Sequence, residues 1–361
     1  MKSIEFHNRE KEIKEIRAIL DRQPTLITFI YGPINSGKTE LINHVIEELP
    51  EEYVVFYINL RTKFLAGYDD FIESLFEMEM ETEAALRKRK ETLAELVSSV
   101  TKVAGIPINK EFLDYVFKDK KPKNAFSYII KLFEEVKNSG KHPVLILDEL
   151  QKIGDVKVNG PLIYELFNFF IDLTKEKHLA HVFAMTSDSL FIEQIYSKAM
   201  LSGRCEYLMV DDFDHERTID FLNSYGFNDH EKEITWQRVG GKLVSLVKLI
   251  NAKISEKNIE DVAGSMFMLR TGEIETRLKL VKELGDEMMI GDKRVDVDYG
   301  KLVSSLKMFA INEEVSTNEM DEISKRYLVK ENILFVDPLT RMIKPQSRLD
   351  LLAIREVIAD A

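Results

Sequence analysis

Residues 32–39 read Gly-Pro-Ile-Asn-Ser-Gly-Lys-Thr and match in full the phosphate-binding pattern G-x-x-x-x-G-K-[ST]. The two glycines allow a tight turn in which successive backbone N–H groups point at phosphate oxygens. We expect Lys38 to reach the β- and γ-phosphates of ATP and to act in catalysis, and the Thr39 hydroxyl to bind Mg²⁺. A chance glycine-rich turn is the alternative. The predicted nucleotide contacts in this segment are Gly32, Pro33, Ile34, Asn35, Ser36, Gly37, Lys38, Thr39 and Glu40.

A pair of carboxylates, Asp148 and Glu149, ends the apolar run 143–147. If that run is a parallel strand, the pair lies at the carboxyl edge of the sheet, where α/β proteins place their ligands. Asp148 is then expected to hold Mg²⁺ through its water shell, and Glu149 to orient and polarise the attacking water. The alternative is a pair that merely caps the next segment, but the phosphate-binding loop favours the Mg²⁺ site.

A hydroxyl follows another apolar run, because residues 181–186 end in Thr186. Next to the acidic strand, Thr186 is placed to sense the γ-phosphate. Ser187 or Asp188 is expected to cap the helix that begins after it.

Short apolar runs alternate with helical patterns over the first 210 residues, which predicts an α/β fold with a five-stranded parallel sheet. Each run is apolar almost throughout, as expected for strands covered on both faces. The expected strands are 25–31, 53–59, 144–147, 181–186 and 207–210. The expected helices are 39–48, 69–78, 125–137, 162–174 and 190–197.

The chain is predicted to form three domains. The α/β core spans residues 1–212, with a charged, largely helical insertion at about 81–123. Residues 213–290 form an α-helical lid, with helices expected at 215–225, 245–255 and 273–284. Residues 291–361 form a winged-helix-like domain, because helices at 299–311, 322–330 and 349–359 accompany a hairpin around Asp337-Pro338.

Composition limits the classes of function. The 361 residues carry a formal net charge of -12, which argues against a large nonspecific contact with nucleic acid. Cys205 is the single cysteine, so neither an intrachain disulfide nor a multi-cysteine zinc site can form. The N-terminus does not read as a signal peptide, and no run of about 18 apolar residues occurs. We therefore expect a cytoplasmic, fully folded protein.

Four segments carry a resemblance to a known family: residues 6–10 (Phe-His-Asn-Arg-Glu), the phosphate-binding loop, LILDELQ at 145–151 and FAMTSDSLF at 183–191. Together they resemble the archaeal ATPase family of P-loop proteins. That family belongs with the AAA+ proteins and the signal-transduction ATPases with numerous domains (the STAND class). The resemblance implies that Asn8, Arg9 and Glu10 lie in the N-terminal segment that packs near the adenine. It also makes Arg204 a candidate arginine finger or phosphate sensor, in cis or in trans, with a structural salt bridge as the alternative. Where STAND proteins usually carry Gly-x-Pro, this chain reads Gly240-Gly241-Lys242.

These observations predict a Mg-ATP-dependent ATPase in which nucleotide state moves the lid and the winged-helix-like domain. The alternative is a nucleotide-gated DNA-binding regulator with little hydrolysis, and a P-loop kinase is a third class. Partners could include a homo-oligomer and a protein client or DNA bound by the C-terminal domain. Its Lys325, Arg326 and Lys330 could face phosphate, but acidic residues lie among them.

Overall fold

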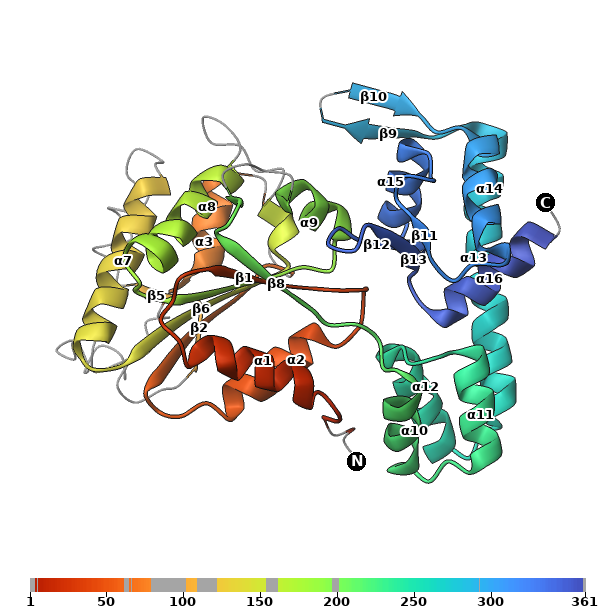
Figure 1. Cartoon of the computed structure of the whole chain (residues 1–361), viewed down its shortest axis with the longest axis horizontal. Coiled ribbons are helices and arrows are strands. Elements are labelled where there is room, and N and C mark those ends of the chain that lie inside the picture. Colours follow the sequence, from red (N-terminus) through yellow and green to blue (C-terminus); the bar gives the residue numbers. More distant parts are fainter. Residues whose placement is uncertain are drawn as a thin grey trace.

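A computed structural model describes residues 4, 6–61, 65, 67–78, 102–108, 122–153, 162–196, 201–291 and 293–359. Its core is a six-stranded parallel sheet with the strand order β4-β2-β6-β7-β1-β8 (Figure 1). Parallel strands bring their carboxyl ends to one edge, so the segments that follow β1, β6 and β7 lie side by side. The strands are β1 Ile27–Tyr31, β2 Tyr53–Asn59, β4 Lys102–Ala104, β6 His142–Asp148, β7 His181–Met185 and β8 Cys205–Met209.

The prediction of five strands is wrong by one strand. The sixth, β4, pairs with β2 at the edge of the sheet, with Val55 opposite Lys102. It lies inside the segment predicted as an insertion, and three residues are too few to give a strand pattern. A separate two-stranded sheet joins β3 (Phe76–Met78) to β5 (Ile106–Ile108), so the helix predicted to reach Met78 ends at Leu75. The charged helical stretch at 85–100 lies outside the described residues.

Helices cover both faces of the sheet, which is why the strands are apolar along their whole length. On one face α1 (Glu10–Leu20) and α2 (Lys38–Glu47) pack against alternate strand residues such as Ile30 and Ile146. On the other face α3, α7, α8 and α9 pack against Phe29, Phe56 and their neighbours. These helices are α3 Tyr68–Leu75, α7 Pro122–Asn138, α8 Leu162–Ile171 and α9 Ser189–Tyr196. A 3-10 turn, Leu150–Ile153, follows β6, and a π-helical turn, Asp172–Glu176, follows α8.

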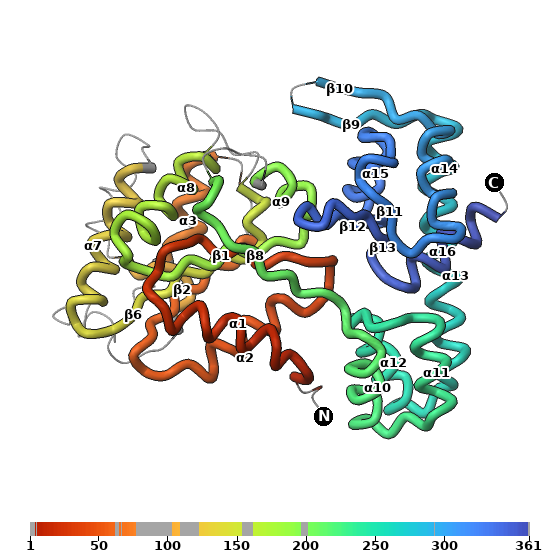
Figure 2. The backbone as a smooth tube through the Cα atoms, viewed as in Figure 1, coloured from red at the N-terminus to blue at the C-terminus, as the bar shows by residue number. Residues whose placement is uncertain are grey.

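After the sheet the chain forms a helical lid of α10 (His215–Asn223), α11 (Asp229–Arg238) and α12 (Leu243–Ile254). The sequence did not predict α11, which lacks a distinct apolar face and is stabilised by a capping box between Asn228 and Glu231. Next comes α13, Ile259–Leu284, a continuous helix of 26 residues that runs from the lid to the C-terminal part of the chain (Figure 2). No helix in the described ranges is both long and apolar enough to cross a membrane.

The remaining elements form a C-terminal module with its own apolar core. A hairpin of β9 (Glu287–Ile290) and β10 (Lys293–Asp296), absent from the prediction, precedes it. The predicted hairpin around Asp337-Pro338 is present, and β11 completes a three-stranded sheet of order β11-β13-β12. The other elements are α14 Tyr299–Lys307, the 3-10 turn Met308–Ala310, β11 Val315–Ser316, α15 Glu322–Lys330, β12 Leu334–Asp337, β13 Met342–Pro345 and α16 Arg348–Ala359.

The C-terminal module is packed directly against the α/β core. Phe335 of β12 is fully buried in the apolar cluster of the core, and Leu190 of the core packs against the cluster of the module. A buried hydrogen bond joins the Tyr31 hydroxyl, at the end of β1, to Asp337 Oδ1 at 2.8 Å. The module therefore lies beside the segment that follows Tyr31, which is the phosphate-binding loop.

Candidate functional site

The loop at 32–39 joins β1 to α2 at the carboxyl edge of the sheet, as the sequence predicts. Gly32 has φ +151°, and a Cβ there would lie 2.1 Å from the carbonyl oxygen of Val210. Gly37 has φ +92° and is the N-cap of α2, so the loop amides and the helix N-terminus share one concave space. Both sources of partial positive charge favour an anion in that space.

Lys38 is buried, and its ammonium group lies inside the loop. Its Nζ donates to the carbonyl oxygens of Gly32 at 3.1 Å and Pro33 at 2.8 Å. Burial, followed by the nearby charge of Lys242, lowers the pKa of Lys38 to about 8. An added phosphate would supply the negative charge that this buried cation lacks.

Two predicted metal-binding residues are in contact. The Thr39 hydroxyl donates to Asp148 Oδ2 at 2.9 Å, and the Tyr57 hydroxyl of β2 donates to the same oxygen at 2.9 Å. Among the residues described, no group of three or more His, Cys, Asp and Glu side chains could hold a metal ion. A site with only a few hard oxygen donors suits Mg²⁺, because this ion takes its other ligands from phosphates and water. The sequence did not predict Tyr57, whose pKa is raised by burial and by Asp148.

Glu149 lies beside Asp148 with φ +62°, a strained conformation that clusters at functional sites. Both of its carboxylate oxygens accept hydrogen bonds. Oε1 accepts from the Arg61 guanidinium, with Nε at 3.1 Å, and Oε2 accepts from Gln151 Nε2 at 2.6 Å. Gln151 Oε1 in turn accepts from the Thr186 hydroxyl at 2.7 Å. The structure thus joins Glu149 to Thr186 through Gln151, and it adds Arg61, which the sequence did not indicate.

The segment after Thr186 starts α9. Asp188 Oδ1 accepts from the backbone N–H groups of Leu190 at 2.9 Å and Phe191 at 3.1 Å. Of the two residues considered as the cap, Asp188 makes the bonds, and Ser187 instead faces the space next to the loop.

A cavity of about 520 Å³ extends from residues 35–40 of the loop to the lid. Its far end is lined by apolar and aromatic side chains, and its total volume lies in the range of small-molecule sites. His7 lines this cavity, and its Nε2 atom is buried without a hydrogen-bond partner among the described residues. The apolar and aromatic lining consists of Ile4, Phe6, His7, Phe213, Phe221, Leu243, Val244 and Val247.

Arg9 and Asn8, predicted to lie near the adenine, have different positions. The buried Arg9 guanidinium donates to Ser36 O at 2.7 Å and Asp211 O at 2.8 Å, and it also pairs with Glu12. Arg9 therefore supports the loop from behind while lining the cavity. Asn8 is not among the residues that line this cavity, although its neighbour His7 is. Sequence reasoning missed His7 because an unpartnered buried nitrogen is visible only in the folded chain.

A second cavity of about 680 Å³ meets the first at Asn35, Arg61 and Ser187. Glu149 and Gln151 line its core side, and Arg326 and Lys330 of α15 line its other side. Lys325, the third basic residue of that helix, is buried in ion pairs with Glu193 and Glu322. The basic side chains of α15 thus face the α/β core in this structure.

Arg204 does not lie at this site. It immediately precedes β8, and its carbonyl oxygen accepts from the N–H of Ile27, at the start of β1, at 3.0 Å. The loop follows the other end of β1, about 16 Å away at 3.3 Å per residue. The strand before Arg204 ends at one edge of the sheet, and the connection returns the chain to the opposite edge. The expectation that Arg204 contacts the phosphates within one chain is therefore wrong, which leaves a structural salt bridge or contact from a second chain.

Comparisons with known proteins agree with this architecture. A family model described as an ATPase domain predominantly from Archaea matches residues 6–249. A second model, the C-terminal domain of MJ1010-like uncharacterized ATP-binding proteins, matches residues 260–358.

Relatives with similar sequences are archaeal. An uncharacterized ATP-binding protein of Pyrococcus abyssi is 46% identical over 355 residues, which cover 98% of each chain. One from Methanocaldococcus jannaschii is 43% identical over 366 residues, covering 99% of this chain and 98% of the relative. Among solved structures, a Walker-type ATPase of P. abyssi superposes with a TM-score of 0.64, covers 97% of this chain and 96% of its own, and is 15% identical. That likeness supports the fold.

Proposed function

The chain belongs to the family of ATPase domains found predominantly in Archaea, and on this premise we propose that it binds ATP with Mg²⁺ and hydrolyses the β–γ phosphoanhydride bond. We further propose that the nucleotide controls how the lid and the winged-helix-like C-terminal module pack on the core. The switch would then be of the AAA+/STAND type that the sequence motifs indicate.

One observation carries the proposal: Thr39 Oγ1 and Asp148 Oδ2 lie 2.9 Å apart, directly beside Lys38 and Glu149. The four side chains come from two segments more than 100 residues apart, and only the parallel sheet brings them together. Phosphoryl transfer to water requires a cation-binding pair, a phosphate-binding lysine and an adjacent carboxylate.

Each side chain has a defined task in this proposal. Lys38 leaves the loop carbonyls and donates to the β- and γ-phosphate oxygens. Thr39 and Asp148 hold Mg²⁺, which neutralises charge on the phosphates when it is bound. Glu149 accepts a hydrogen bond from the attacking water and takes its proton as the oxygen bonds to phosphorus and the bond to the ADP oxygen breaks. Thr186 orients Gln151, and Gln151 orients Glu149.

Turnover by the isolated chain is expected to be slow. In this structure Glu149 accepts hydrogen bonds from Arg61 and Gln151, one on each carboxylate oxygen, and these donors compete with the attacking water for the same oxygens. Arg61 is the more exposed of the two donors and can turn toward a phosphate in the first cavity. Nucleotide binding would then free Glu149 as it attracts Arg61.

The test is phosphate release from Mg-ATP by the wild-type chain and by Glu149→Gln, with ATP affinity measured for both. We expect Glu149→Gln to bind ATP normally and to release phosphate at least about tenfold more slowly, a threshold set below the roughly 10²- to 10⁴-fold that a general base typically contributes. Glu165→Gln is the matched control, because this exposed glutamate lies on α8 away from the site. Equal, measurable release by wild type and Glu149→Gln would contradict the role of Glu149. Nucleotide binding without release by either protein would contradict hydrolysis by the chain alone, and absent binding would contradict the whole site.

A further inference from the structure

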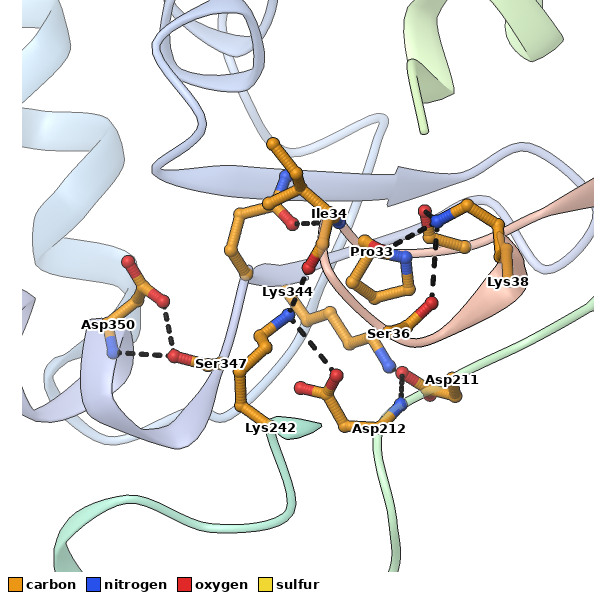
Figure 3. A network of polar contacts seen from close by, with 12 residues as sticks. Pro33, Ile34, Ser36, Lys38, Asp211, Asp212, Lys242, Lys344, Ser347 and Asp350 are labelled. Atoms are coloured by element: carbon orange, nitrogen blue, oxygen red, sulfur yellow. Dashed lines mark hydrogen bonds and ion pairs between the residues drawn. The ribbon is translucent and has the colours of Figure 1, made fainter. Parts of the chain in front are cut away.

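Two parts of the chain outside the α/β core bind the backbone of one loop residue, Ile34. Its N–H donates to Gln346 Oε1 of the C-terminal module at 3.1 Å, and its carbonyl oxygen accepts from Lys242 Nζ of the lid at 2.9 Å. Figure 3 shows Lys242 reaching toward both Ile34 and Asp212, with Lys38 on the other side of the loop. The third residue of the phosphate-binding loop is therefore held from both sides.

The side chain of Gln346 is fixed before it meets the loop. Its Nε2 donates to Leu334 O at 2.9 Å, and its backbone N–H donates to Ile333 O at 3.0 Å. The residue is 4% exposed, so its amide group has no room to rotate. The oxygen of the amide, which carries partial negative charge, is thus the end presented to Ile34.

Lys242 is held as firmly. It is buried, its Nζ lies 3.2 Å from Asp212 Oδ1, and the preceding Gly241 carbonyl accepts from the Phe213 N–H at 3.0 Å. Removing Lys242 would leave the half-buried Asp212 carboxylate without this cation, a cost unrelated to nucleotide. Gln346 is neutral and is the better side chain with which to test the contact.

The position of Ile34 gives the contact a chemical meaning. Ile34 and Asn35 line the second cavity, which Glu149 also lines and which meets the first cavity at Asn35. Backbone N–H groups of this loop are donors for phosphate oxygens. Gln346 occupies one of these donors and places a partially negative oxygen beside the γ-phosphate position. ADP has no γ-phosphate and would leave this contact intact.

We propose that Gln346 is a specificity-determining residue, by which the C-terminal module lowers the affinity of the loop for ATP relative to ADP. This inference rests on the proposed function, since it assumes that nucleotide binds at the loop. ATP must break the Gln346–Ile34 hydrogen bond to use the Ile34 N–H, and breaking it releases one of the contacts that hold the module on the core.

The experiment measures equilibrium binding of ADP and of a non-hydrolysable ATP analogue to the full chain with Mg²⁺. Gln346→Met keeps the length of the side chain and removes the acceptor. It should tighten binding of the analogue about fivefold, the effect of one neutral hydrogen bond, and leave ADP binding unchanged. Gln346→Glu keeps an acceptor and adds a charge beside the γ-phosphate position. It should weaken binding of the analogue relative to ADP.

Opposite shifts in the analogue-to-ADP affinity ratio are a result that a purely structural role of Gln346 would not produce. Gln237→Met is the matched control, because the side chain of this exposed lid glutamine bonds only to Glu233 in the described structure. Its ratio should equal that of wild type. The inference would be overturned if both Gln346 variants kept the wild-type analogue-to-ADP affinity ratio, or if they bound both nucleotides equally more weakly. Either result would leave the proposed function intact. Failure of the wild-type chain to bind either nucleotide would instead contradict the proposed function.

Discussion

The Tyr57 hydroxyl offers a test of how the metal-binding carboxylate is oriented. It donates to Asp148 Oδ2 at 2.9 Å from a half-buried position on β2, and it would not itself touch Mg²⁺. Tyr57→Phe removes this donor and leaves the ring in place. Asp148 then keeps one donor to that oxygen, Thr39, which has to turn toward Mg²⁺ when the metal binds.

The magnitude follows from the kind of bond that is lost. A hydrogen bond to a charged group contributes about 1.5–3 kcal/mol, and loss of a partner that orients a metal ligand typically costs 10- to 100-fold in metal affinity. Because Thr39 still contacts Asp148 before the metal binds, we expect the lower end of this range. The affinity for Mg²⁺ should therefore fall about tenfold, which is about 1.4 kcal/mol.

The assay titrates an ATP analogue at several free Mg²⁺ concentrations and again in the presence of a chelator. Affinity without Mg²⁺ should match wild type, and the increase that Mg²⁺ produces should require about tenfold more metal. Tyr53→Phe is the control, since this tyrosine lies on the same strand but donates to Leu20 O, outside the site. An unchanged Mg²⁺ dependence in Tyr57→Phe, or an equal change in Tyr53→Phe, would refute the reasoning.

Two further predictions concern charge and packing. The pKa of Lys38 is about 8 without nucleotide and should rise beside a bound phosphate. ATP binding above pH 8 must therefore take up a proton. The affinity of the chain for ATP should be about tenfold lower at pH 9 than at pH 7. Lys38→Arg keeps its positive charge, so whatever affinity for ATP it retains should not depend on pH in this range. A wild-type affinity for ATP that is equal at pH 7 and pH 9 would contradict the lowered pKa of Lys38. Gly241→Ala should destabilise the fold by about 2 kcal/mol or more, because its Cβ would lie 1.8 Å from Phe213 O. Gly264→Ala in α13 adds a Cβ that would meet no neighbouring atom within 4 Å, so it should stabilise the fold by about 0.5–1 kcal/mol. Thermal unfolding of both variants and of wild type measures these changes in stability.

The parts of the site that the sequence predicts are those made by contiguous residues. The loop at 32–39 needs a strand before it, a helix after it and two glycines, and all of these are adjacent in the chain. Asp148 and Glu149 could be placed because a parallel sheet brings strand ends to one edge. The contacts of Thr39 with Asp148 follow from that rule once the strand order is known.

The rest depends on tertiary contacts that have no local pattern. Arg61, Tyr57 and Gln346 are ordinary residues in the sequence, and each gains its role from a partner more than 80 positions away. The strand β4 is only three residues long, and α11 lacks the apolar face by which a helix is recognised. Arg204 was misplaced because the family position fixes its order along the chain but not the edge of the sheet at which it lies.

The length of α13 has a mechanical consequence. A continuous helix of 26 residues is about 39 Å long, at 1.5 Å per residue, and it begins at the lid and ends at the β9–β10 hairpin. Under the proposed switch, a tilt of about 10° of this helix at the lid would displace its far end by about 7 Å. That end carries the hairpin with the exposed side chain of Met289. A small movement of the lid beside the nucleotide would thus become a larger displacement of the β9–β10 hairpin, without a change in the α/β core.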